Sequence, residues 1–286
     1  MSAQTTLSGI AANQIRPRAA ALVGPLGCGK TTLFERLLAA AGSPVPPVSD
    51  RGVTVGQSRF KGEAWSLVDC SGTLGVGPDA IAVLEAVDIA VVVCEPAPER
   101  ARALAPILAA LDARHVPHLL FVNKVDTLSG RVRDTLAALQ EFSQRPLVLR
   151  QVPICEETGI IGYVDVVSSR AYRYRPGEAS VLFSLPARME AGETEAREAL
   201  VEVLAEQDSA LAQKILNDVR LSSDEIFGQL KQDQQSGAIV GVLLGAADRE
   251  HGVRRLWKAL RHDAPDPLMT AGRRGVSATG EALLPI

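Results

Sequence analysis

The sequence of 286 residues predicts an α/β fold, a mostly parallel and doubly wound sheet with a small α+β subdomain inserted into it. Between residues 18 and 125, apolar runs alternate with segments of helical periodicity, which is the pattern of successive β-α-β units. Near residue 141 this pattern changes to short runs in which polar and apolar residues alternate, followed by a helical stretch rich in Ala, Leu and Glu. A buried strand and an amphipathic helix then return near residue 238.

The first part of the chain supplies strands and helices in alternation. Strands are expected at residues 19–23, 64–68, 87–94 and 118–122. The last two are almost continuously apolar, as strands are when both faces of a parallel sheet are covered. Helices are expected at residues 32–41, 79–86, 99–113 and 131–142.

The second part of the chain predicts a small antiparallel sheet and then helices. Its strands are expected at residues 146–152, 160–167, 170–175 and 180–185, and its helical stretch at 192–235. A strand at 238–244 and a helix at 250–262 complete the first domain. The predicted organisation is a flexible arm (1–17), a first domain (18–140 and 237–263), an inserted α+β subdomain (141–236) and a linker or tail (264–286).

Composition narrows the class of protein. An apolar content of 47% predicts a folded globular chain, and the net charge of −3 lacks the basic character of nucleic-acid-binding domains, so no direct sequence-specific nucleic-acid contact is expected. The four cysteines are scattered, which argues against a zinc site or a disulfide framework and fits a reducing cytosol. The first 18 residues lack the apolar core of a signal peptide, and no apolar run has the length of a membrane span, so a cytoplasmic protein without a membrane partner is expected.

Residues 24–31 read G-x-x-x-x-G-K-T, between an apolar run and a helical stretch. This is a phosphate-binding loop in its expected strand–loop–helix setting, so the predicted fold is that of a P-loop NTPase. Its glycines let the backbone approach phosphate oxygens, and the N–H groups at the helix start point at the anion. Lys30 is expected to reach the outer phosphates and Thr31 to hold Mg²⁺. The alternative is a glycine-rich turn that merely caps a helix.

A second motif indicates which nucleotide is bound. Asn123-Lys124-Val125-Asp126 follows a buried strand, and the Asp126 carboxylate can accept hydrogen bonds from both N1–H and the exocyclic amine of guanine. Asn123 is expected to tether this base pocket to the phosphate loop, and the Lys124 stem to pack on the purine. The alternative is an ordinary polar turn after a strand.

Two shorter stretches lie between these motifs. Asp69-Cys70-Ser71-Gly72 ends a strand, where Asp69 can hold Mg²⁺ through water and the Gly72 amide can meet the γ-phosphate. Arg51-Gly52-Val53-Thr54 offers a second hydroxyl, Thr54, for the same ion. A loop threonine with no such role is the alternative for Thr54.

In combination these motifs resemble the translational GTPases, and specifically elongation factor G. The resemblance covers about residues 18–267. The inserted segment resembles the extra subdomain of that family at residues 151–154, 159–167 and 170–172, and residues 245–247 and 251–253 resemble its guanine loop and the helix that follows.

The resemblance implies a GTP-binding domain with the inserted subdomain, using GTP/GDP and Mg²⁺ and acting with the ribosome in translocation or recycling. The phosphate-binding residues that it implies are Gly24, Pro25, Leu26, Gly27, Cys28, Gly29, Lys30, Thr31, Thr32, Asp69 and Gly72. The implied magnesium ligands are Thr31, Thr54 and Asp69, and the implied catalytic positions are Lys30, Gly72 and Thr73. The implied guanine-binding residues are Asn123, Lys124 and Asp126, with Ala246 and Ala247 supporting the base through their backbone.

The chain also departs from the family pattern. Thr73 stands where the family has the His that orients the attacking water, and Ser71 stands where it has Pro. Threonine has one short hydroxyl and does not titrate near neutral pH, so it cannot take the same role. The segment between Thr31 and Asp69 is shorter than in the family, and the sequence ends where the family continues into further domains.

Three hypotheses follow from the sequence. The first is an elongation factor G-like GTPase, either a fragment of a longer factor or a reduced paralogue. The second is a GTP-binding sensor with little hydrolysis, which the Thr73 and short-switch departures motivate. The third is a P-loop ATPase or kinase of another lineage.

Overall fold

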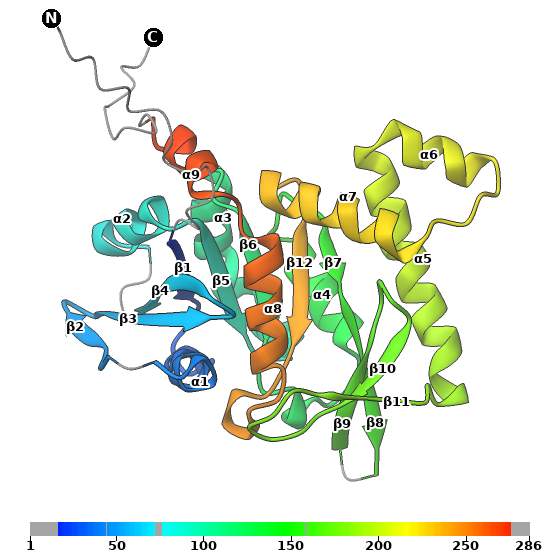
Figure 1. The fold of residues 1–286 in the computed structure, drawn as a ribbon, viewed down its shortest axis with the longest axis horizontal. Coiled ribbons are helices and arrows are strands. Elements are labelled where there is room, and N and C mark those ends of the chain that lie inside the picture. Colours follow the sequence, from blue (N-terminus) through cyan, green and yellow to red (C-terminus); the bar gives the residue numbers. More distant parts are fainter. Residues whose placement is uncertain (1–16, 44, 72–75, 158, 276–286) are drawn as a thin grey trace, which may run out of the picture.

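The computed structural model describes residues 17–43, 45–71, 76–157 and 159–275 (Figure 1). Its centre is an eight-stranded sheet in the order β2-β3-β4-β1-β5-β6-β12-β7. From β4 to β7 neighbouring strands run parallel, and β3 and β2 extend the sheet in antiparallel fashion. The strands of this sheet are β1 (Arg18–Val23), β2 (Val48–Asp50), β3 (Val53–Phe60), β4 (Glu63–Cys70), β5 (Ile89–Cys94), β6 (His118–Val122), β7 (Leu147–Leu149) and β12 (Val240–Leu244).

Helices cover both faces of this sheet, which confirms the predicted doubly wound α/β class. One face packs on α1 (Lys30–Ala41) and α8 (Val253–Asp263) through a cluster that includes Leu33, Phe34 and Trp257. The Trp257 indole donates to the Leu37 carbonyl at 2.8 Å, which joins the two helices. The opposite face packs on α2 (Pro78–Ala86), the 3₁₀ helix η1 (Pro98–Leu104), α3 (Ala105–Ala113) and α4 (Val132–Gln140).

The inserted part has its own sheet and its own helices. The antiparallel sheet runs in the order β11-β10-β9-β8, with β8 (Gln151–Glu156), β9 (Gly159–Asp165), β10 (Arg170–Arg173) and β11 (Val181–Phe183). The helices α5 (Glu190–Gln207), α6 (Ser209–Leu216) and α7 (Ser223–Ser236) share an apolar cluster with Val148 and Val166. Figure 1 shows α5 and α6 on the far side of β12 from α1, and α7 crossing the end of β12 in this view.

The structure differs from the sequence expectations in four places. The helix expected at 99–113 is two elements, η1 and α3, with Pro106 in the first turn of the second. The strand expected at 146–152 divides, because β7 joins the large sheet beside β12 and only β8 joins the small one. The switch stretch expected at residues 51–54 is the turn between β2 and β3 together with the first two residues of β3. Within the segment expected as a linker, α9 (Pro267–Arg273) forms, with Arg273 donating to the Val87 carbonyl.

The parallel strands fix where chemistry can occur. The carboxyl ends of β1, β4, β5, β6 and β12 lie at one edge of the sheet because these strands run in the same direction. The segments that leave this edge are therefore neighbours in space although they are far apart in sequence. They begin at Gly24, Ser71, Glu95, Asn123 and Gly245.

Candidate functional site

The phosphate-binding loop connects β1 to α1 and depends on its glycines. Gly27 and Gly29 have φ values of 84° and 88°, which side chains rarely adopt. A Cβ on Gly29 would also stand 2.4 Å from the Asn123 amide nitrogen. Helix α1 starts at Lys30, directly after Gly29, so its first N–H groups face the loop. The loop therefore has the backbone conformation and the helix end that suit an anion.

Lys30 lies inside this loop. Its side chain is buried, and its ammonium donates to the Pro25 carbonyl at 2.9 Å. The neighbouring Cys28 thiol is also buried, and burial raises its pKa, so the thiol stays neutral beside the lysine. Of the other predicted loop residues, Leu26 is exposed at the tip and Thr32 follows in the first turn of α1. The Lys30 ammonium therefore lies where it can donate a hydrogen bond to a phosphate oxygen bound in the loop.

Thr31 and Asp69 meet at the junction of α1 and β4. The Thr31 hydroxyl donates to Asp69 Oδ2 at 2.7 Å, and within the described residues the other carboxylate oxygen of this buried Asp has no hydrogen-bond partner. The Thr31 hydroxyl and the Asp69 carboxylate are both oxygen ligands of the kind that Mg²⁺ prefers. Two protein ligands are enough for this ion, because Mg²⁺ usually keeps several of its waters. Over the ranges that the structure describes, no cluster of three or more His, Cys, Asp or Glu side chains forms an alternative metal site.

Of the predicted switch residues, the structure describes Thr54 but not Gly72 or Thr73. Thr54 lies within β3 rather than in a loop, directly opposite Asp69 in the β3–β4 register, and its hydroxyl is 2.9 Å from that of Ser49. Side chains of directly opposite residues share a face of the sheet, so Thr54 is next to the Thr31–Asp69 pair. The predicted catalytic positions Gly72 and Thr73 lie outside the described residues.

Asn123 joins three of the loops at the sheet edge. Its amide donates to the Cys28 carbonyl at 2.9 Å and its side-chain oxygen accepts from the Ala247 N–H at 2.9 Å. Both contacts are buried, because Asn123 is 2% exposed. One side chain after β6 thus holds the phosphate loop and the Gly245–Ala247 turn at fixed positions, and truncating it would leave buried polar groups unpaired.

Lys124 adds a second tether, and it involves a residue that sequence reasoning missed. The Lys124 ammonium donates to the Gly27 carbonyl at 2.6 Å and to Glu95 at 2.7 Å. Partial burial alone would raise the pKa of Glu95, but Lys124 and Arg100 together hold it below its ordinary value. The signal for Glu95 was its place directly after a buried strand, at the same edge of the sheet.

Asp126 is paired with a residue that the motif does not contain. The Arg249 guanidinium donates to Asp126 Oδ2 at 2.8 Å, from the short helix η4 (Ala247–Arg249). The adjoining turn is rigid, because Ala246 exchanges two backbone hydrogen bonds with His251 and both Ala246 and Ala247 are buried. The loops that hold Asp126 and Ala246 thus follow β6 and β12 as neighbours, joined by the Val125 N–H to the Gly245 carbonyl at 3.1 Å and by the Arg249–Asp126 pair.

Comparison with known proteins places these features in a family. The family model described as "Elongation factor Tu GTP binding domain" matches residues 49–266, and the phosphate loop lies before this range. An elongation factor G-like protein of Synechocystis sp. is 35% identical over 282 residues, covering 92% of this chain and 42% of its own. Elongation factor G 1 of Geobacter sulfurreducens is 25% identical over 280 residues, covering 90% of this chain and 41% of its own.

Similarity of structure extends over the same length. A crystal structure of a protein from Thermus thermophilus superposes with a TM-score of 0.75 at 24% identity, covering 89% of this chain and 41% of the other. At that identity the match supports the fold alone. The chain spans about two fifths of the length of the curated relatives it matches. Among the helices that the structure describes, each is too short or too polar to cross a bilayer.

Proposed function

The chain belongs to the family of elongation factor Tu GTP-binding domains, as an elongation factor G-like member, and we propose that it binds GTP with Mg²⁺ and hydrolyses it to GDP and phosphate. The observation that carries this proposal is the meeting of three elements at one sheet edge. These are the phosphate loop, the Thr31–Asp69 pair and the Asn123 tether to Ala247. Together they supply acceptors and donors for a triphosphate at one end and a purine at the other.

Each residue has a role in this proposal. Lys30 and the loop N–H groups bind the phosphates, and Asp126 reads N1–H and the exocyclic amine of guanine. Thr31 and Asp69 hold Mg²⁺, with Thr54 as a further hydroxyl, and the ion supplies positive charge to the phosphate oxygens. Lys30 remains near the γ-phosphate, where it can stabilise the charge that grows as the phosphate leaves.

The names of the relatives suggest which process GTP hydrolysis serves. One of these relatives is elongation factor G 1 of Geobacter sulfurreducens, and this chain covers about two fifths of its length. We therefore propose that the ribosome is the partner and that hydrolysis serves translocation or recycling in the cytoplasm, with other domains or partner proteins completing the factor.

GTP turnover with and without ribosomes tests this proposal. Purified chain is mixed with radiolabelled GTP, and free phosphate is followed over time, first alone and then with saturating ribosomes. Stimulation by ribosomes that disappears in the Lys30→Ala variant is the expected result. Unchanged, background turnover at saturating ribosomes would contradict the ribosomal role.

A second candidate function is favoured by Thr73. This residue stands where the resembling family has a water-orienting His, and losing such a group lowers the rate of hydrolysis by about two orders of magnitude or more. The alternative is a GTP sensor that binds the nucleotide without useful hydrolysis. It predicts that GTP bound to the purified chain remains intact for hours, and that Thr73→His increases phosphate release.

A further inference from the structure

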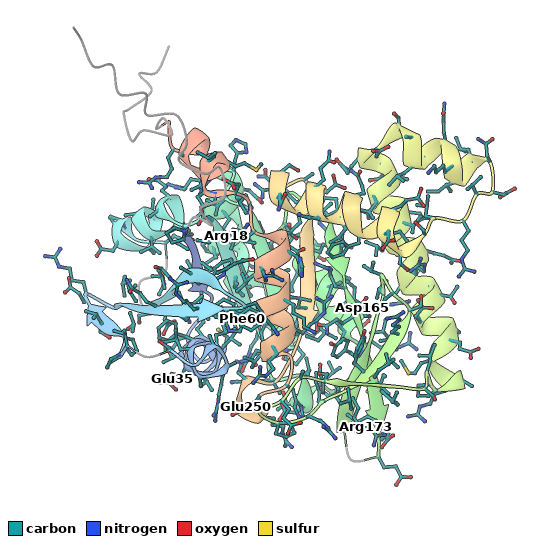
Figure 2. The ribbon with its side chains drawn as sticks, in the orientation of Figure 1. Arg18, Glu35, Phe60, Asp165, Arg173 and Glu250 are labelled. Carbon is teal, nitrogen blue, oxygen red and sulfur yellow. The ribbon has the colours of Figure 1, made fainter. Side chains whose placement is uncertain are left out.

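A cavity of about 330 Å³ lies away from the phosphate loop, between the small sheet and the helices α7 and α8. All three tyrosines of the chain, Tyr163, Tyr172 and Tyr174, contribute to its wall. Figure 2 labels two further lining residues, Asp165 on the side of the small sheet and Glu250 before the start of α8. The volume is in the range of pockets that hold small ligands.

The tyrosines form a column of rings that ends at the cavity. Tyr172 and Tyr163 stack with centroids 5.4 Å apart, and Tyr174 stacks on His251 at 4.4 Å and lies 5.5 Å from Tyr163. Burial raises the pKa of Tyr163 to about 12, so this phenol is neutral at cellular pH. Tyr163 and Tyr174 are buried whereas Tyr172 is half-buried, which makes Tyr172 the most accessible of the three rings for a planar ligand.

Helix α8 turns a row of basic side chains to the same cavity. Arg254, Lys258 and His262 are four residues apart in succession and all contribute to the wall. Side chains at this spacing lie one above the other on one face of a helix. The row therefore presents two cations, Arg254 and Lys258, to the cavity, whereas burial lowers the pKa of His262 and its imidazole adds little positive charge at neutral pH.

Three of the four acidic residues of the wall already form ion pairs with arginines other than Arg254. Asp165 binds Arg255 at 2.7 Å, Glu178 binds Arg175 at 3.0 Å, and Glu250 binds Arg36 at 2.9 Å. In the described part of the chain Arg254 and Lys258 form no ion pair, and Arg254 donates only to the Gly177 carbonyl. Among the described acidic residues of the wall, only Asp224 forms no ion pair, so its carboxylate alone is available to Arg254 and Lys258.

The wall also contains an unsatisfied buried donor. Arg150 is 1% exposed and pairs with Asp263, but its Nε has no hydrogen-bond partner among the described residues. A buried N–H without an acceptor is costly, and a ligand or ordered water normally satisfies it. A purely solvated basic face, the simpler interpretation of the α8 row, accounts neither for this donor nor for the half-buried ring opposite.

We propose that this cavity binds a small molecule that joins a planar ring to a phosphate, of the size and class of a nucleoside monophosphate. The ring stacks on Tyr172, which tolerates different bases because every base has a π-face. The phosphate binds Lys258 and Arg254, which form no ion pair within the described residues and face only one unpaired wall carboxylate, that of Asp224. This site is separate from the phosphate loop, so it goes beyond the proposed GTPase function and does not depend on it.

The tyrosines themselves provide the readout. Protein labelled with ¹³C only in its tyrosine rings gives signals from three residues, all of which line the cavity. The labelled chain is titrated with adenosine monophosphate and with uridine monophosphate, in the presence of excess GDP to occupy the phosphate loop. The expected result is a saturable shift of the Tyr172 signal. Adenosine and ribose 5-phosphate, which each lack one half of the ligand, should bind about tenfold more weakly.

Variants distinguish this cavity from other sites. Lys258→Ala and Tyr172→Ala should each weaken binding about tenfold, because each removes one of the two ligand contacts. In the Tyr172 variants binding is followed by the signals of Tyr163 and Tyr174, which line the same cavity. Tyr172→Phe keeps the ring and the fold, and should bind as the unaltered chain does. Lys61→Ala, which removes an exposed lysine in the turn after β3, is the matched control and should also leave binding unchanged. The proposal is overturned if neither monophosphate shifts Tyr172, or if Lys258→Ala and Tyr172→Ala bind as tightly as the control.

Discussion

Removing Arg249 should increase the affinity of the chain for guanine nucleotides. The Arg249 guanidinium donates to Asp126 Oδ2 at 2.8 Å, and the same carboxylate is the proposed acceptor for N1–H and the exocyclic amine of guanine. An acceptor already bound to an arginine must release it, at least in part, before it can bind the base. In the Arg249→Ala variant this competing contact is gone.

The size of the effect follows from exposure. The Arg249 side chain is 63% exposed and that of Asp126 27%, so solvent screens their attraction. Ion pairs of this kind contribute about 0.2–1 kcal/mol, which corresponds to an increase in affinity of about 1.4- to 5-fold on removal of the arginine. Because salt screens exposed pairs, the difference between the variant and the unaltered chain should shrink at high ionic strength.

Calorimetric titration of nucleotide-free protein with GDP, at low and high salt, measures both effects. Lys214→Ala removes the same charge from an exposed pair with Glu225, on helices remote from Asp126, and serves as the control. A lower affinity for GDP in Arg249→Ala than in Lys214→Ala would refute the reasoning, because Arg249 would then be contacting the nucleotide rather than competing with it.

Three further predictions concern recognition and stability. Asp126→Asn should weaken GDP binding and strengthen binding of xanthosine diphosphate in the same titration, because an amide donates to the second carbonyl of xanthine. Arg150→Met should lower the free energy of unfolding in urea by about 3–5 kcal/mol, since it leaves the buried Asp263 unpaired, and adding Asp263→Leu should restore most of it. Burial lowers the pKa of His118 from 6.5 to about 4, so the unfolded chain binds the proton more readily. Stability should therefore fall by up to about 3 kcal/mol as the pH drops from 6.5 to 4, and His118→Asn should flatten this part of the urea-unfolding profile.

The elements of the fold that could be predicted are those with a local signature. The strands β5 and β6 are continuous apolar runs, so their burial on both faces could be predicted without knowledge of any partner. The strand β3 has polar or small residues at alternate positions and lies near the sheet margin, where no such signature exists. The three residues of β7 are apolar and would suit either the large or the small sheet. They join the large sheet because β12 lies beside them, which their own sequence does not indicate.

The candidate site divides in the same way. Lys30, Thr31, Asn123 and Asp126 belong to motifs whose spacing has a chemical reason, and the structure brings the segments that hold them to one sheet edge. Glu95 and Arg249 belong to no motif. Their contacts with Lys124 and Asp126 depend on how separate loops approach one another, which no local pattern encodes.

Arg150 has a mechanical consequence for the whole molecule. Its backbone N–H donates to Val242 in β12 and its carbonyl accepts from Val166 beside the small sheet, so a single residue is hydrogen-bonded to both halves of the chain. The next residue, Gln151, accepts the N–H of Leu244, at the point where β12 enters the Gly245–Ala247 turn. A displacement of the inserted subdomain would therefore act directly on β12, the strand that leads into the proposed guanine-binding turn. The inserted subdomain and the proposed purine site thus share the hydrogen bonds of two adjacent residues, Arg150 and Gln151.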